Sequence, residues 1–423
     1  MSNQTKTVRV EKPRGTRDFL PDEMEKRRAV ERTMRKIVES YGYREICTPT
    51  FEHLELFTLK SGEQIVEEIY AFKDKSGRNL ALRPELTAPV MRVFVNDCAV
   101  MPRPLRFYYF ANCFRYERPQ KGRYREFWQF GVELIGSDKP ESDAEVITLA
   151  YTILRELGLD FELHVGHVGI LRNILKGIDA ETSSKIFRLI DKNKIDELES
   201  FMLNSGLENV YDKVIAVIQA EDIDSLPDFA ESDVEKLRRV CELLDVCGVD
   251  YSVNTRVVRG LDYYTGVVFE VYAENLGAQK QICGGGSYRL AHVFGGENVP
   301  STGFAIGFDR VMEICSPEVQ KPLKVAVVHA NQLEESIKLA TKLRKELRNV
   351  VVVTDVMGRS LKKQLSYFSE FDFAIIVGKR EVERGYYTVK DMKSGKQEEL
   401  ELEELIEKLF EKTSAWQKEQ KTN

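Results

Sequence analysis

The stretch that decides the fold is residues 106–136, which read RFYYFANCFRYERPQKGRYREFWQFGVELIG. Its second half alternates as a β-strand does, and one apolar face is formed by Trp128, Phe130, Val132 and Leu134. The opposite face carries Gln129 and Glu133. Polar side chains opposite a core face must meet either water or a polar pocket.

The two halves of this stretch are predicted to pair as a hairpin through a basic loop. Its cationic residues are Arg115, Arg118, Lys121, Arg123 and Arg125. Pairing would place Arg115 and Glu117 on one concave surface with Gln129 and Glu133, and Phe127 could stack there on a planar ligand such as a base. A solvated sheet face with salt bridges is the alternative.

The composition is that of a cytoplasmic globular protein with two or three domains. The 423 residues carry a net charge of -6, with 43% hydrophobic and 31% charged residues, so a surface that grips nucleic acid everywhere is excluded. The N-terminus is polar, no apolar run reaches membrane-spanning length, and the seven scattered cysteines suit a reducing compartment. With five isolated histidines, no protein-held zinc site is expected.

Before the hairpin, a helix is predicted from Pro21 to about Gly42, followed by a short strand over residues 44–49. A second hairpin is predicted over residues 72–82, with its turn at residues 75–78. Glu85 and Thr87 come just past its returning strand. They could hold an ammonium group by directed hydrogen bonds, or they could cap the following helix.

After the hairpin, residues 259–272 read RGLDYYTGVVFEVY. A strand should begin near Thr265, because Val267, Phe269 and Val271 share one face. Arg259 in front of it indicates either a ligand site or a solvated edge strand. Further on, the glycines at 284–286 allow close approach of a ligand or form a turn, and residues 302–306 form a strand leading to a helix that holds Arg310.

The remaining segments read as a helical insertion and a separate C-terminal domain. Residues 169–246 have helical spacing and no recognisable chemistry. After residue 322, the apolar runs 324–328, 350–353 and 373–377 alternate with helices, which is typical of a small parallel α/β domain. Arg359, Lys362 and Lys363 form either a solvated face or a contact for a phosphate-bearing partner.

These residues resemble the histidyl-tRNA synthetases of class II. Residues 114–125, FRYERPQKGRYR, resemble motif 2 of the class, residues 303–310, GFAIGFDR, resemble motif 3, and the helix that ends before Pro49 resembles motif 1. The segment RGLDYY at 259–264 is similar to the more selective histidine signature. The resemblance covers nearly the whole chain.

The resemblance implies an α+β fold, in which an antiparallel sheet flanked by helices forms the catalytic domain. Residues 1–168 and 251–320 would form that core, residues 169–250 a helical insertion, and residues 321–423 an α/β anticodon-binding domain. The implied substrates are L-histidine, ATP with Mg²⁺, and histidine tRNA. Motif 1 implies a homodimer.

For ATP, the resemblance assigns Arg115 to the α-phosphate, Glu117 to the adenine, Arg123 to the outer phosphates, and Phe127 and Arg310 to the two faces of the adenine ring. For histidine, it assigns Glu85, Thr87 and Gln129 to the α-amino group, and Glu133, Tyr263, Tyr264 and Tyr288 to the side-chain pocket. Arg259 matches the catalytic arginine, acting together with Arg115. Gln120, Arg359 and Lys362 are predicted to contact tRNA.

Two alternative functions compete with this reading. A synthetase-like regulatory subunit of histidine biosynthesis would be expected to lack the anticodon-binding domain and to lose signature residues. A non-catalytic tRNA-binding protein would be expected to lose Arg115, Arg259 or Arg310. This chain keeps all of these features.

Overall fold

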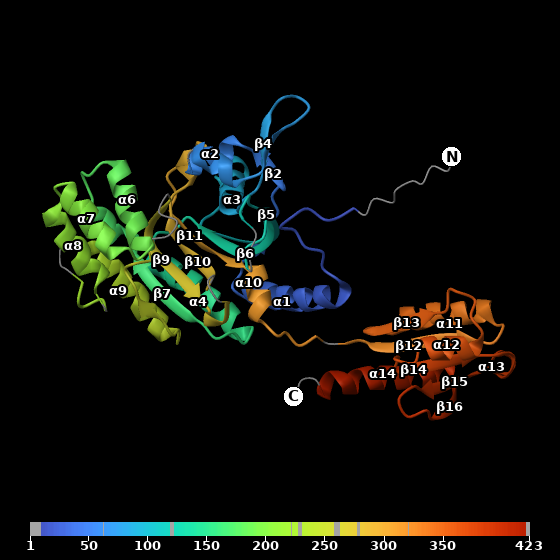
Figure 1. Cartoon of the computed structure of the whole chain (residues 1–423). Coiled ribbons are helices and arrows are strands. Elements are labelled where there is room, and N and C mark those ends of the chain that lie inside the picture. The colour runs from blue at the N-terminus through green and yellow to red at the C-terminus, as the bar shows by residue number, and fades with distance from the viewer. Residues whose placement is uncertain are drawn as a thin grey trace. The chain divides into compact units, whose positions relative to one another are not determined.

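The structure is a computed structural model that describes residues 10–61, 63–118, 122–220, 222–226, 231–257, 263–276, 280–319 and 321–419. Gln120 and Arg259, both predicted site residues, lie outside these ranges. The chain divides into two compact units, Met1–Pro317 and Glu318–Asn423 (Figure 1). Within the described residues, no helix is long and apolar enough to cross a membrane.

In the described part of the first unit, the main sheet has eight strands in the order β1-β5-β6-β11-β10-β9-β7-β8. These strands are β1 (Arg44–Glu45), β5 (Leu105–Phe114), β6 (Glu126–Ile135), β7 (Glu162–His167), β8 (Ser252–Val253), β9 (Tyr264–Tyr272), β10 (Gln281–Tyr288) and β11 (Ser301–Gly307). Neighbours from β5 to β7 pair antiparallel, whereas β1 and β8 pair parallel at the two edges. The predicted antiparallel sheet is therefore confirmed, with a parallel pair added at each edge.

The hairpin β5–β6 has the predicted parity. Glu133 pairs in register with Phe107, and Gln129 pairs with Ala111. Phe130 and Val132 are fully buried in the largest core cluster, on the face opposite to Glu133. Glu133 is itself only 1% exposed, so its face meets a polar pocket and not water.

Helices α1 (Pro21–Ser40), α4 (Pro140–Glu156) and α10 (Phe308–Ile314) cover the core face of this sheet (Figure 1). Both long helices begin with proline at a first-turn position, where its fixed φ and missing N–H cost nothing. After α1, Gly42 adopts a φ of 82°, which ends the helix as predicted. The strand predicted at 44–49 is confined to the two residues of β1.

The opposite face of the sheet carries a smaller layer. A three-stranded sheet, order β2-β4-β3, and short helical segments make up this layer: β2 (Phe51–His53), β3 (Ala71–Lys73), β4 (Asn79–Leu82), α2 (Glu55–Ser61), the 3₁₀ segments η1 (Glu63–Glu68) and η5 (Ala291–Phe294), α3 (Thr87–Val93) and the π-helical η2 (Phe94–Cys98). The predicted hairpin is β3–β4. Leu86, Val90 and Tyr288 join the two layers in one cluster.

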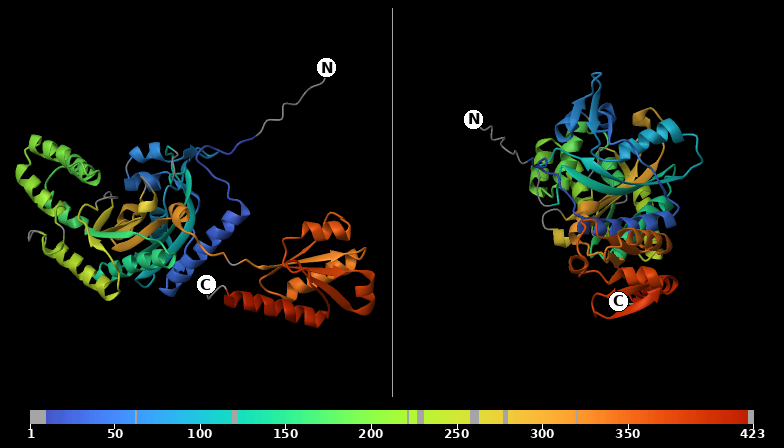
Figure 2. Two further views of the ribbon diagram at one scale, coloured as in Figure 1. Left: turned by 60° about the horizontal axis from the view of Figure 1, so that its bottom comes forward. Right: turned by 90° about the vertical axis from the view of Figure 1, so that its right-hand side faces the viewer.

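A group of helices follows β7 and gathers at one end of the first unit (Figures 1 and 2). They are α5 (Val168–Ile174), α6 (Ala180–Asp191), α7 (Ile195–Asn204), α8 (Glu208–Ile218) and α9 (Glu231–Val246), and the 3₁₀ segment η4 (Glu274–Leu276) follows β9. Asp179 caps α6 by accepting a 2.9 Å hydrogen bond from the backbone N–H of Thr182. The helices occupy the region predicted to be helical.

The second unit contains a five-stranded sheet in its described part, in the order β13-β12-β14-β15-β16. Its elements are β12 (Leu323–His329), β13 (Val350–Thr354), β14 (Phe373–Val377), β15 (Tyr386–Asp391), β16 (Gln397–Glu401), α11 (Leu333–Glu346), α12 (Leu361–Tyr367), α13 (Lys379–Arg384) and α14 (Leu402–Glu419). The first three strands are parallel, as predicted, but β15 and β16 are antiparallel. The purely parallel sheet is therefore wrong: β16 is a polar edge strand, and its sequence lacks the apolar run of a buried strand.

Candidate active site

Two adjoining cavities lie in the first unit, on the side of the sheet that carries Gln129 and Glu133. The arginine cavity, of about 390 Å³, is lined by Arg115, Arg123 and Arg310 among others. The glutamate cavity, of about 270 Å³, is lined by Glu85 and Glu133 among others. Seven residues line both: Arg115, Glu117, Gln129, Tyr263, Tyr264, Gly284 and Ala305. The cavities therefore form one continuous site.

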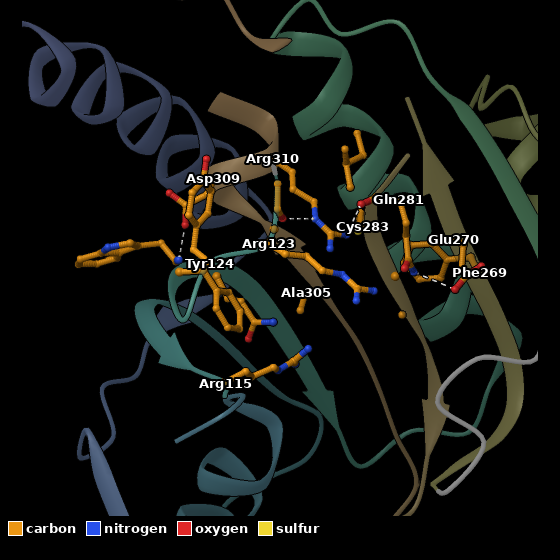
Figure 3. Close-up of a pocket in the computed structure, with 18 of the residues that line it drawn as sticks. Arg115, Arg123, Tyr124, Phe269, Glu270, Gln281, Cys283, Ala305, Asp309 and Arg310 are labelled. Carbon is orange, nitrogen blue, oxygen red and sulfur yellow. Dashed lines mark hydrogen bonds between the residues drawn. The ribbon is translucent and has the colours of Figure 1, made fainter. Parts of the chain in front are cut away.

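The arginine cavity collects three guanidinium groups from three parts of the chain (Figure 3). Arg115 follows β5, and its Nε donates to the carbonyl of Pro84 at 3.0 Å. Arg310 lies in α10 and donates to the carbonyls of Gln281 at 2.6 Å and Gly122 at 3.1 Å. The Nη1 atom of Arg123 lies 3.4 Å from Oε2 of Glu117. Such a group of fixed donors suits a polyanion such as a phosphate chain.

An aromatic ring and the small residues of two strands also line the arginine cavity. The guanidinium of Arg115 lies 5.2 Å from the centre of the Phe127 ring. The glycines of β10 are part of the sheet and not a turn, because they pair with β9 and β11. A Cβ on Gly285 would lie 2.3 Å from the carbonyl oxygen of Gly303. Small residues on β10 and β11, such as Gly284 and Ala305, leave space in front of the sheet.

One carboxylate, Glu270 on β9, also lines the arginine cavity and is 4% exposed. Its Oε1 accepts a 2.8 Å hydrogen bond from Gln281, and its Oε2 accepts one from Tyr272. Figure 3 shows Glu270 and Gln281 on adjacent strands at the far side from Arg115. This carboxylate is thus held in place at the edge of the cationic space.

Glu133 forms the floor of the glutamate cavity. Tyr288 donates a 2.5 Å hydrogen bond to its Oε2, and Tyr109 donates one of 3.3 Å to its Oε1. Burial raises the pKa of Glu133 to about 8. Gly303 pairs with Glu133 across β6 and β11, and a Cβ there would lie 2.1 Å from Oε2, so only glycine leaves room for the carboxyl group.

Glu85 caps a helix and also lines the glutamate cavity. Its carboxylate accepts hydrogen bonds from the backbone N–H groups of Thr87, at 2.7 Å, and Ala88, at 3.2 Å, so it caps α3. It also lines the glutamate cavity, where Lys60 Nζ lies 3.2 Å from its Oε1. Beside this pair, the rings of Tyr263 and Tyr264 lie 4.4 Å apart.

A buried ion cluster forms part of the wall of the arginine cavity. Asp309, next to Arg310, is 3% exposed and accepts hydrogen bonds from Arg17 at 2.6 Å and Arg27 at 2.8 Å. Its other oxygen accepts the backbone N–H of Trp128 at 2.6 Å. The cluster joins the N-terminal segment, β6 and α10.

Comparison with known proteins identifies the family of the chain. Residues 15–311 match the family Histidyl-tRNA synthetase, and residues 324–412 match the family Anticodon binding domain.

The chain belongs to the histidyl-tRNA synthetase family.

It is 57% identical to the histidine-tRNA ligase of Archaeoglobus fulgidus over 94% of this chain and 99% of that protein. It is 52% identical to the histidine-tRNA ligase of Methanosarcina acetivorans, over 95% and 98% of the two chains. Among solved structures, the ligand-free S. aureus histidyl-tRNA synthetase aligns with a TM-score of 0.70 and 28% identity, covering 95% of this chain and 100% of that one.

Within this synthetase, most of the predicted site residues meet in the two cavities. Those that line them are Glu85, Thr87, Arg115, Glu117, Arg123, Phe127, Gln129, Glu133, Tyr263, Tyr264, Tyr288 and Arg310. Arg359 and Lys362 lie in the second unit. Arg359 pairs with Asp355 and lies over the Tyr367 ring at 4.2 Å, whereas Lys362 is exposed on α12.

Sequence reasoning missed several residues that line or support the two cavities. Lys60, Glu270 and Asp309 line these cavities, and Tyr109 donates a hydrogen bond to Glu133. Glu270 had a signal, because it interrupts the apolar pattern of β9. Lys60 had none, because a lysine in a short amphipathic helix looks like any solvated lysine.

Proposed function

We propose that this chain activates L-histidine with ATP, giving histidyl-adenylate and pyrophosphate, and then transfers the histidyl group to the 3′ end of histidine tRNA. The observation that carries the proposal is the junction of two unlike cavities at Arg115 and Gln129. A cationic cavity for a phosphate chain meets a buried polar cavity for a small polar side chain. The atoms that react, the α-carboxylate and the α-phosphorus, would meet at this junction.

The arginine cavity would hold ATP. Arg115 would bind the α-phosphate and Arg123 the outer phosphates, while Glu117 would accept from the adenine amino group. Phe127 and Arg310 would lie on the two faces of the adenine ring. Support comes from the way backbone carbonyls already hold Arg115 and Arg310, since donors fixed before binding stabilise developing charge at little reorganisation cost.

Mg²⁺ would enter with ATP. Within the described residues, no group of three or more acidic, histidine or cysteine side chains could hold a metal ion by itself. Magnesium bound mainly by substrate phosphates needs only one or two carboxylates, and Glu270, which lines the arginine cavity, would supply one. The magnesium ion would neutralise part of the negative charge of the triphosphate.

The glutamate cavity would select histidine. Glu133 and Tyr264 would each bind one ring nitrogen of the imidazole, with Tyr288 orienting Glu133 through the 2.5 Å hydrogen bond. Glu85, Thr87 and Gln129 would hold the α-ammonium group. An apolar side chain of similar size would leave the buried carboxyl and phenol groups without partners, which discriminates strongly against it.

The chemistry would require no covalent bond to the enzyme. A carboxylate oxygen of histidine attacks the α-phosphorus of ATP and pyrophosphate leaves. A terminal ribose hydroxyl of the tRNA then attacks the carbonyl carbon, and AMP leaves. Arg115 and Arg259 would stabilise the negative charge on the reacting groups, Arg259 being assigned by its place in the histidine signature.

The test is exchange of labelled pyrophosphate into ATP with a panel of amino acids. Exchange should depend on histidine and should fall at least about a hundredfold in Arg259→Ala. Arg188→Ala, an exposed arginine on α6, is the matched control and should leave exchange unchanged. Exchange driven by another amino acid would overturn the assignment of the substrate.

We also infer a homodimer and a cytoplasmic location. The homodimer rests on the resemblance of α1 and β1 to motif 1, and analytical ultracentrifugation of the full chain would test it. The location rests on the reaction, because charged tRNA is used by ribosomes. For tRNA binding, Gln120, Arg359 and Lys362 stay predictions, and filter binding of the three alanine variants would test them.

A further inference from the structure

Lys60 is a charged side chain buried inside the glutamate cavity. Only 7% of its side chain is exposed, and its Nζ lies 3.2 Å from Glu85 Oε1 and 4.3 Å from the centre of the Tyr263 ring. Burial opposes its charge, but Glu85, Tyr263 and Glu133 together outweigh burial, so the pKa of Lys60 is raised. The cavity therefore contains an ammonium group paired with a carboxylate before any substrate binds.

The two side chains of this ion pair, Glu85 and Lys60, differ in conformational freedom. Glu85 is held by the backbone N–H groups of Thr87 and Ala88 at the start of α3. Lys60 reaches the cavity from the last turn of α2 on a flexible four-carbon chain. A ligand that competes for this ion pair will therefore displace the lysine and not the glutamate.

A zwitterionic substrate makes such competition unavoidable. In the proposed function, the α-ammonium group of the bound histidine contacts the carboxylate of Glu85. Two cations would then share one carboxylate away from water, which is unfavourable unless a second anion arrives with the second cation. An α-amino acid carries that anion on the neighbouring carboxyl carbon.

We propose that Lys60 binds the α-carboxylate of the substrate, exchanging Glu85 for it when the α-ammonium takes Glu85. The inference rests on the proposed function and adds a substrate-binding residue to it. Of the described residues that line the glutamate cavity, the cations are Lys60 and Arg115, and Arg115 lies at the junction with the arginine cavity. A carboxylate has two oxygens, so Lys60 can bind one and leave the other for a second cation.

A Lys60 that binds the substrate carboxylate can be distinguished from a Lys60 that only holds Glu85 in place, because histidine and histidinol differ in that carboxylate. Histidinol keeps the imidazole and the ammonium group of histidine but has a hydroxymethyl group in place of the carboxylate. If Lys60 binds the carboxylate, removing its charge weakens histidine binding and spares histidinol. If Lys60 only holds Glu85 in place, both ligands lose affinity together.

The experiment is calorimetric titration of the full-length protein with L-histidine and with L-histidinol, in the absence of ATP. In Lys60→Met, the Kd of histidine should rise by about tenfold to a hundredfold, as expected for loss of a charge-assisted hydrogen bond. The Kd of histidinol should stay the same or fall, because its ammonium group no longer shares Glu85 with Lys60. Lys60→Arg should restore most of the histidine affinity. Lys75→Met is the matched control, because Lys75 is exposed in the turn of the β3–β4 hairpin.

Parallel losses for the two ligands, or no loss for either, would overturn the role of Lys60. If Lys60→Met does not fold, Lys60→Gln gives the same comparison with a polar side chain. Pyrophosphate exchange by the unmodified protein separates this inference from the proposed function. Absent histidine-dependent exchange contradicts the function, whereas normal exchange with an unchanged ratio of the two dissociation constants contradicts only the inference.

Discussion

Arg17 donates a 2.6 Å hydrogen bond to Asp309, although 292 residues separate them in the chain. The same guanidinium lies 3.5 Å from the centre of the Tyr124 ring, in the loop that leads into β6. Arg27 binds the same carboxylate oxygen from α1. The residue before Arg310 is thus a buried anion that fixes three segments around the arginine cavity.

Asp309→Asn should destabilise the protein and weaken ATP use. The change leaves two arginines beside a neutral amide, one of them almost fully buried, which costs about 3 kcal/mol of unfolding free energy. Misplacement of Arg310 should lower kcat/KM for ATP by about tenfold or more. Urea unfolding and exchange kinetics measure the two effects. Glu297→Gln, which breaks the exposed pair with Arg103, is the control and should change neither.

Glu133→Gln should alter the pH dependence of stability. The pKa of this carboxyl rises from 4.5 to about 8 on folding, so the folded state keeps a proton that the unfolded state releases. The stability from this group is therefore present below pH 4.5 and is lost as pH rises to about 8, by at most about 1.4 kcal/mol per pH unit. The Glu133→Gln variant has no ionisable group at this position, so its stability does not fall over this pH range for this reason.

Relative to wild type, Glu133→Gln should accordingly be more stable at pH 8.5 than at pH 5.5, by up to about 3 kcal/mol in urea unfolding. The variant should also lose histidine-dependent exchange, because an amide has one acceptor oxygen whereas Glu133 accepts hydrogen bonds from Tyr109 and Tyr288 on two. Tyr288→Phe should move the pH transition to higher pH, since the Tyr288 hydrogen bond lowers the pKa of Glu133. A stability difference that is the same at both pH values would contradict the assignment.

Gly303→Ala should damage the glutamate cavity selectively. The new methyl group would meet Glu133 Oε2 at 2.1 Å and the carbonyl oxygen of Val132 at 2.4 Å, and backbone cannot move aside cheaply. We expect KM for histidine to rise by about tenfold or more. Gly307→Ala on the same strand is the control, because its Cβ would have its first contact at 3.6 Å. Equal effects of the two changes on KM for histidine would refute this view of Gly303.

Deletion of the chain after Pro322 should separate the two half-reactions. Every described residue that lines either cavity belongs to the first unit, and the second unit has its own core around Val325 and Ile375. Pyrophosphate exchange should therefore persist while charging of histidine tRNA falls. Unchanged charging would mean that the second unit does not contribute to tRNA recognition.

Sequence reasoning succeeded where the information is local. The alternation in residues 126–135 gave the hairpin, its two faces and the placement of Gln129 and Glu133 in one cavity, because strand parity depends only on neighbours. The histidine signature and the two arginine motifs gave the family, which the comparisons confirm. The position of Arg259 stays a prediction.

The remainder depends on contacts between distant segments. Lys60 and Tyr109 reach the glutamate cavity from elements whose own patterns are those of an ordinary helix and strand. Arg17 was passed over because a lone arginine near the N-terminus gives no hint of a partner at Asp309. β16 was missed because its residues are exposed and polar apart from Leu400, which local patterns cannot distinguish from a loop.

The hairpin β5–β6 places the largest core cluster on one face and the substrate residues on the other. A slip of one residue in its register would exchange the faces, sending Glu133 into hydrocarbon and Val132 into the cavity. Misregistered chains would therefore be both unstable and inactive, and no soluble population with a well-formed core and a scrambled pocket should accumulate. In this synthetase, the packing of the core and the shape of the amino-acid pocket therefore depend on the same register between two strands.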